Sequence, residues 1–74
     1  IMYRSSEELA APWQTGIEYQ ILDDAKHPDG RDPRTSAGAF YALIACEGKA
    51  LAPVGAWNRA RIVARGSRIE HWLN

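Results

Sequence analysis

The sequence AWNRARIVARGSRIEHWLN, residues 56–74, decides the fold of this chain. Apolar residues alternate with polar ones in two runs, and only Gly66 and Ser67 lie between Arg65 and Arg68. Strict alternation is typical of a half-buried β-strand, and a glycine-containing pair suits a tight two-residue turn. The stretch therefore predicts a β-hairpin of two antiparallel strands.

The two-residue turn also fixes the predicted register of this hairpin. Counting outward from the turn, we expect these pairs: Arg65 with Arg68, Ala64 with Ile69, Val63 with Glu70, Ile62 with His71, Arg61 with Trp72 and Ala60 with Leu73. Side chains alternate between the two faces of a strand, so one face of the hairpin is more apolar than the other. This predicted core face carries Ala60, Ile62, Ala64, Ile69, His71 and Leu73.

Length and composition limit the class of protein. The 74 residues allow one small domain, 1–74, and a chain this short buries only about 60% of the surface that its unfolded form exposes. Nine basic residues balance nine acidic ones, which argues against nucleic acid or a membrane surface as a partner. The single cysteine, Cys46, excludes an internal disulfide, and a buried free thiol is the simplest interpretation.

Turn-rich segments separate the other strand signals. A serine followed by acidic residues predicts one helical turn over 5–11, ended by Pro12, and 24–38 reads as a long loop. Trp13 then either packs over a sheet edge or lines a cleft. Strands are expected over 1–4, 17–23 and 39–46, the last of them largely buried. The pattern predicts an all-β domain built mainly of antiparallel strands.

Several separated motifs occur together in one order. EYQILD (18–23) is followed by His27, then by AGAFY (37–41), by GAWN (55–58) and by the two hairpin runs. Together they resemble the 3-keto-disaccharide hydrolase domain family, formerly a domain of unknown function. The resemblance implies a concanavalin A-like, laminin-G-like jelly-roll β-sandwich, of which this chain matches the central part. It also implies a bacterial, extracytoplasmic protein, periplasmic or secreted.

A partial β-sandwich has consequences for association. Domains of the family are more than twice as long as this chain, so strands that would cover its apolar face are missing from it. An exposed apolar face and unpaired strand edges favour pairing with another chain. We therefore expect a homo-oligomer in which two chains stack their sheets.

The family resemblance implies a carbohydrate ligand, namely a 3-keto-disaccharide or another 3-ketoglycoside. In such a sugar the C2 proton is acidic because it lies beside a ketone, and its removal permits elimination of the group at C1. This chemistry needs a general base, a means to stabilise the enolate oxygen, such as hydrogen-bond donors or a divalent cation, and an acid for the leaving group.

Two residues are the catalytic candidates. Glu18 and Gln20 project from one face of the strand expected over 17–23, about 6.6 Å apart, and one substrate could touch both. Glu18 is the candidate base, and the alternative is a carboxylate on a solvated sheet face. His27 precedes a proline in the long loop and is free to reach a ligand.

The remaining candidates would bind substrate or metal. Tyr41 and Trp57 either stack on sugar rings or pack in the core, and His71 is either a core histidine or a ligand in a concave cleft. Asp23 caps its loop or ligates a metal; a wider cation site with neighbouring carboxylates would match no known motif. The substrate-binding candidates are Gln20, Tyr41, Trp57, Arg4 and His71.

Two other functions stay open at this point. The same architecture hosts many lectins, so the chain could be a non-catalytic carbohydrate-binding module. It could also be an oligomeric structural fragment without activity. Replacement of Glu18 by Gln separates the enzyme from the binding module, because a catalytic base should lose turnover and keep ligand affinity, whereas a binding contact should lose affinity.

Overall fold

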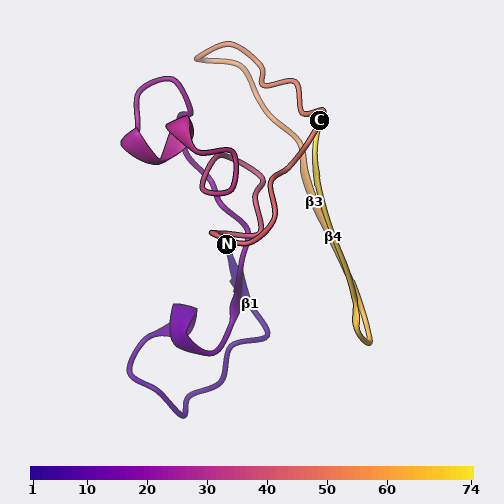
Figure 1. Ribbon diagram of the computed structural model, residues 1–74. Helices are drawn as coiled ribbons and strands as arrows, with labels where there is room; N and C mark the ends of the chain where they lie inside the picture. The colour runs from indigo at the N-terminus through magenta and orange to yellow at the C-terminus, as the bar shows by residue number, and fades with distance from the viewer.

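The computed structural model describes residues 1–74 as two small antiparallel sheets connected by long irregular segments, without an α-helix (Figure 1). One sheet pairs β1 with β2, and the other pairs β3 with β4. The elements are β1 (Met2–Tyr3), the 3₁₀ turn η1 (Pro12–Gln14), β2 (Ile17–Glu18), the 3₁₀ turn η2 (Pro28–Arg31), β3 (Ala60–Arg65) and β4 (Arg68–Leu73). The predicted all-β class is confirmed, as part of a β-sandwich.

The β3–β4 hairpin is the most regular part of the molecule. All six predicted pairs are present, from Arg65 opposite Arg68 to Ala60 opposite Leu73. Gly66 has φ +56°, a positive value of the kind that the first central residue of a type II′ hairpin turn requires. On the predicted core face Leu73 is buried and His71 is half-buried, whereas Ala60 and Ala64 remain exposed.

Only the beginning of the strand predicted over 17–23 forms a strand, β2. β2 pairs with β1 through Ile17 and Glu18, and Tyr19 then forms a bridge with Phe40. Gln20 exchanges backbone hydrogen bonds with Gly38 and Ala39. The chain then leaves the sheet, so the expected alternation fails and Ile21 is exposed.

The prediction of a buried strand over 39–46 is wrong. The backbone N–H groups of Leu43 and Ile44 both donate to the carbonyl of Phe40, at 2.9 and 3.0 Å, and Ala42 has φ +64°. The chain therefore turns back on itself here, and Phe40 bridges both Tyr19 and Ile44. An apolar run without a period does not distinguish a strand from a hydrophobic turn.

The helical turn expected over 5–11 is also wrong. The turn instead starts at Pro12 and forms η1. The N–H of Ala11, the residue before η1, donates to the side chain of Gln14 at 2.9 Å. Proline favours the first position of a helical turn because its missing N–H would have no partner there. Pro12 thus begins the turn that the sequence suggested it would end.

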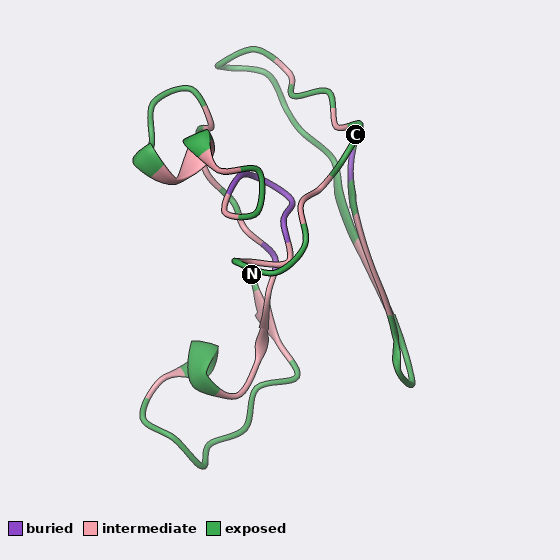
Figure 2. Cartoon of the chain, in the orientation of Figure 1, coloured by how far each residue is buried: buried purple, intermediate pink, exposed green.

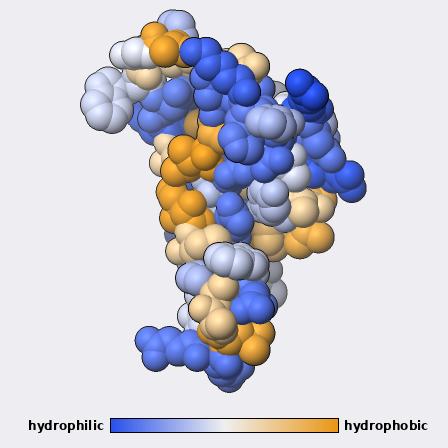
Figure 3. Space-filling view, turned by 90° about the vertical axis from the view of Figure 1, so that its left-hand side faces the viewer, coloured by the Kyte–Doolittle hydropathy of each residue, from blue (hydrophilic) through white to orange (hydrophobic).

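The core is small and lies where the middle of the chain meets β4 (Figure 2). Tyr19 is its largest fully buried side chain, and its hydroxyl donates to the carbonyl of Trp72 at 2.8 Å. Ala37, Ala39 and Leu73 are the other buried apolar residues. Many large apolar side chains stay at the surface, where Figure 3 shows hydrophobic patches along the middle of the molecule. No helix of the structure is long and apolar enough to cross a bilayer.

Candidate functional site: an acidic and aromatic cleft beside β2

A cavity of about 470 Å³ lies between η1, the end of β2 and the turn that follows Phe40. We call it the β2 cleft. Aromatic and carboxylate side chains form much of its wall, a composition that suits a sugar with apolar faces and many hydroxyls. Its lining residues are Trp13, Gly16, Glu18, Gln20, Asp29, Phe40, Tyr41 and Leu43.

Glu18 and Tyr41 reach the cleft from neighbouring backbone segments. The N–H of Tyr41 donates to the carbonyl of Glu18 at 3.1 Å, which ties the turn after Phe40 to the end of β2. Both side chains are half-buried. Two sequence-predicted site residues are therefore brought together by a single backbone contact.

Asp29 is the second carboxylate of the cleft. The hydroxyl of Tyr41 donates to Oδ2 of Asp29 at 3.2 Å. This hydrogen bond, the charge of Asp29 and, to a smaller extent, burial and the charge of Glu18 raise the pKa of Tyr41 above its usual value. Tyr41 consequently stays a neutral phenol across the physiological range.

Gln20 lines the cleft, but its amide is used by the protein. Nε2 donates to the carbonyl of Thr35 at 3.1 Å, and Oε1 accepts from the N–H of Ile21 at 3.0 Å. The side chain therefore supports the long loop at one end of the cleft and retains one N–H for a ligand.

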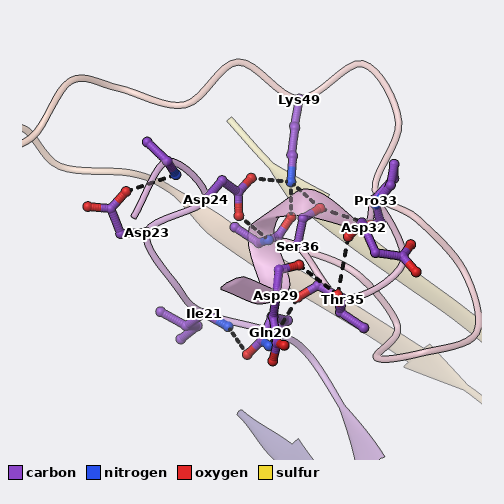
Figure 4. A network of polar contacts seen from close by, with 12 residues as sticks. Gln20, Ile21, Asp23, Asp24, Asp29, Asp32, Pro33, Thr35, Ser36 and Lys49 are labelled. Atoms are coloured by element: carbon purple, nitrogen blue, oxygen red, sulfur yellow. Dashed lines mark hydrogen bonds and ion pairs between the residues drawn. The ribbon is translucent and has the colours of Figure 1, made fainter. Parts of the chain in front are cut away.

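The long loop that delivers Asp29 is held by a half-buried ion pair between Asp24 and Lys49 (Figure 4). Nζ of Lys49 lies 2.7 Å from Oδ2 of Asp24, and it also donates at 2.7 Å to Oγ of Ser36 and to the carbonyl of Ala37. The other carboxylate oxygen of Asp24 accepts from the N–H of Ala37 at 2.7 Å. One ammonium group thus joins both ends of the loop.

His27 does not line the cleft, although its Nδ1 lies 3.9 Å from Oδ2 of the lining residue Asp29. Nδ1 accepts from the N–H of Asp29 at 3.1 Å and caps η2, which leaves Nε2 of the exposed ring free. Asp23 is exposed as well, and its Oδ1 accepts from the N–H of Ala25 at 3.0 Å, as in a loop cap. No three His, Cys, Asp or Glu side chains gather to hold a metal ion, and Asp24 is paired with Lys49, so the residues around Asp23 do not fit a cation.

His71 lies far along the chain from the cleft residues and packs in the core. Nδ1 lies 3.2 Å from the carbonyl of Gly38, which makes it the donor, and Nε2 lies 2.6 Å from the hydroxyl of Tyr3. Its ring also packs against Tyr19 and Phe40, with centroids 4.7 and 5.9 Å away. Burial lowers the pKa of His71, against a smaller opposing effect of its backbone hydrogen bonds, so the ring is a neutral core histidine here.

Arg4 and Trp57 also lie outside the cleft. Nη1 of Arg4 donates to the carbonyl of Gly66 at 2.6 Å and ties the chain after β1 to the hairpin turn. Trp57 is 96% exposed in the loop before β3. Neither residue contributes to the wall of the β2 cleft.

Asp29 is the residue of the cleft that the sequence did not single out by itself. It lies in a turn-rich loop 11 residues after Glu18, among other aspartates with ordinary turn roles. The proline and glycine around it signal a rigid turn, yet the pairing of its carboxylate with Tyr41 depends on the fold. Trp13 lines the cleft, which is one of the two positions that the sequence left open.

Comparison with known proteins supports the family resemblance that the sequence motifs suggest. The model of the 3-keto-alpha-glucoside-1,2-lyase-like domain matches residues 1–74. A curated relative, the 3-keto-disaccharide hydrolase of Bacteroides thetaiotaomicron, is 33% identical over 60 residues, which cover 77% of this chain and 21% of the relative. The matched region thus spans about a fifth of the relative's length. No solved structure matches the chain. The chain belongs to the 3-keto-alpha-glucoside-1,2-lyase-like domain family.

Proposed function

We propose that residues 1–74 form part of a domain that cleaves 3-keto-disaccharides or related 3-ketoglycosides, and that the β2 cleft holds the sugar. The observation that carries the proposal is the cleft itself, in which the Glu18 carboxylate lies among Trp13, Phe40 and Tyr41. Membership of the family and the printed name of the relative support the substrate class.

Glu18 is the proposed general base. Its carboxylate removes the C2 proton of the 3-keto sugar, and the electron pair of that C–H bond forms the C1–C2 double bond by way of the enolate. The C1–O bond breaks, and the departing alcohol takes a proton from an acid. No acid is assigned within this chain: Nδ1 of His27 accepts from the N–H of Asp29, so its only ring hydrogen is on Nε2, and a neutral imidazole is too weak an acid for this step.

The aromatic residues supply orientation. Trp13 is 70% exposed at the mouth of the cleft and presents a wide apolar surface to the C–H groups of a sugar ring. Arg4, Trp57 and His71 have no part in this proposal, because their contacts place them elsewhere.

The Glu18→Gln variant of the full-length protein that carries this chain tests the proposal. Gln keeps the size of the side chain but cannot accept the C2 proton, so turnover of a 3-keto-disaccharide should fall at least about 100-fold. Binding, measured by calorimetry, should change much less. Glu47→Gln makes the same change at an exposed glutamate outside the cleft lining, and this matched control should keep its turnover.

The same variant distinguishes the alternative functions. A carbohydrate-binding module predicts no turnover by the unmodified protein and a loss of affinity in Glu18→Gln. A structural fragment predicts no response to the sugar by either protein. Unchanged turnover in the variant would refute Glu18 as the base.

We also propose that the isolated 74-residue chain self-associates. Leu43 and Ile44 are more than 60% exposed, and Trp72 is half-exposed on β4. Burying such residues against a second copy is favourable by about 25 cal/mol per Å² of apolar surface. Light scattering at about micromolar concentration should detect a dimer or larger species, and a monomer would contradict the proposal.

A further inference from the structure

The β2 cleft contains one neutral hydroxyl beside two carboxylates. The hydroxyl is that of Tyr41, which donates to Oδ2 of Asp29 at 3.2 Å. A phenol has a single O–H hydrogen, and the hydrogen bond to Asp29 uses it. The lone pairs of the Tyr41 oxygen then remain, and they can only accept a hydrogen bond from a ligand.

Asp29 is held in place by its own backbone. Its N–H donates to Nδ1 of His27 at 3.1 Å, and its carbonyl accepts from Oγ1 of Thr35 at 2.6 Å. The next residue, Gly30, passes so close to the backbone of Asp24 that a Cβ there would overlap it. The backbone of the loop is therefore fixed at Asp29, from which its carboxylate reaches Tyr41.

Tyr41 is fixed from the other side of the cleft. Its N–H donates to the carbonyl of Glu18, and its phenol ring lines the cavity. The Tyr41–Asp29 hydrogen bond thus joins two segments, each anchored by other contacts. The phenol oxygen has little freedom to turn away from the cleft.

The other polar groups of the cleft are mainly acceptors too. Glu18 and Asp29 are carboxylates, and the oxygen and one N–H of the Gln20 amide form hydrogen bonds within the protein. Sugar hydroxyls are donors that match such a wall, whereas a ketone oxygen, which only accepts, does not. The composition of the wall therefore favours a hydroxyl-bearing part of the ligand near Tyr41.

We infer that Tyr41 is a specificity-determining residue whose phenolic oxygen accepts a hydrogen bond from a sugar hydroxyl, and that Asp29 is the positioning residue that holds it. This inference rests on the proposed function and assigns Tyr41 a polar role in place of ring stacking. The raised pKa of Tyr41 agrees with it, because the phenol keeps the hydrogen that it donates to Asp29.

The test measures binding of a 3-keto-disaccharide by calorimetry, with Glu18→Gln as the parent so that the ligand is not consumed. Tyr41→Phe keeps the ring and removes the oxygen, and its affinity should fall about tenfold. Asp29→Ala should weaken binding to a similar extent. Asp29→Asn, which retains an acceptor for the hydroxyl of Tyr41, should restore most of the affinity.

The double variant and the ligand give two further checks. If Asp29 acts only through Tyr41, then Asp29→Ala should have no further effect once Tyr41 is Phe. One monodeoxy analogue of the disaccharide should bind the parent about tenfold more weakly, and bind Tyr41→Phe as well as the intact sugar does. This ligand comparison uses a well-folded parent, so it does not depend on the fold of Asp29→Ala.

The outcomes are separable. Equal binding by the parent and Tyr41→Phe would overturn the inference and leave the sugar site in place, because ring stacking would then suffice. Additive losses in the double variant would mean that Asp29 contacts the sugar directly, which also overturns it. Absence of any binding to the parent and to the unmodified protein would overturn the proposed function, and this assignment with it.

Discussion

The β3–β4 hairpin and the segment that forms the β2 cleft are held together in different ways. The hairpin is a continuous ladder of six residue pairs around one glycine turn. The cleft segment has a two-residue pairing of β2 with β1 and isolated backbone contacts around Tyr19 and Phe40, and its long loop depends on side-chain anchors such as Lys49 and Asp24. Loss of one contact in a ladder leaves many others, whereas loss of one side-chain anchor frees a whole loop.

The largest effect on stability should come from removing the ammonium group that joins the long loop. In Lys49→Met the Asp24 carboxylate, 18% exposed, loses its charge partner, and two further acceptors lose their donor. We expect a loss of about 2–3 kcal/mol in the free energy of unfolding, measured by urea denaturation, after allowance for partial exposure. Hydrogen exchange should rise first over residues 24–38.

The hairpin offers a matched control for that variant. Arg68 pairs with Glu70 at 3.2 Å, but the arginine side chain is 76% exposed. Arg68→Met should therefore cost about 0.5 kcal/mol or less. Equal losses in Lys49→Met and Arg68→Met would show that the two regions do not differ as described.

Glycine substitutions compare the two regions at the backbone. A Cβ at Gly30 would overlap the backbone of Asp24, so Gly30→Ala should cost about 2 kcal/mol and weaken sugar binding by displacing Asp29. Gly66→Ala meets open space and suffers only from the left-handed φ, a cost of about 1 kcal/mol. Unfolding curves and calorimetric titrations of both variants check this, and unchanged sugar affinity in Gly30→Ala would contradict it.

The smallest effect should be a pH dependence that originates at His71, where β4 of the hairpin packs against Tyr19 and Phe40. Burial lowers the pKa of His71 in the folded state, so the unfolded chain binds the proton more readily. The stability that the neutral ring provides is present above its unfolded pKa of 6.5 and is lost as the pH falls through the lower folded value. Below that value the penalty is complete.

His71→Gln removes the titrating group. Between about pH 7.5 and about pH 5, the unmodified protein should lose more stability than the variant, as measured by the urea midpoint. The difference between the two proteins isolates His71 from carboxylates that titrate in the same range. Parallel pH profiles would refute the link between burial of the ring and stability.

The same contrast between regions explains what the sequence predicts. The hairpin register follows from local alternation and a two-residue turn, so every pair was predictable. The ends of β2 and the turn after Phe40 depend on contacts with distant residues, such as the bridge from Tyr19 to Phe40, and local patterns do not reveal those. Proximity of Glu18 and Gln20 along one short segment was predictable for the same reason that the hairpin was.

Long-range contacts also separate the predicted site residues. Tyr41 enters the cleft through a backbone bond to Glu18, and Asp29 joins it because Lys49 and Gly30 shape the loop. His71 alternates with apolar residues on β4, and its ring packs half-buried against Tyr19 and Phe40. A sequence pattern gives the face of a residue, but the fold decides which partners meet there.

The most direct test of the central claim is a crystal structure of the full-length Glu18→Gln protein with a 3-keto-disaccharide bound. We predict that the sugar occupies the β2 cleft, with its C2 beside the amide that replaces the Glu18 carboxylate, a ring against Trp13 and a hydroxyl on the oxygen of Tyr41. A sugar bound elsewhere, with the β2 cleft filled only by solvent, would contradict the account.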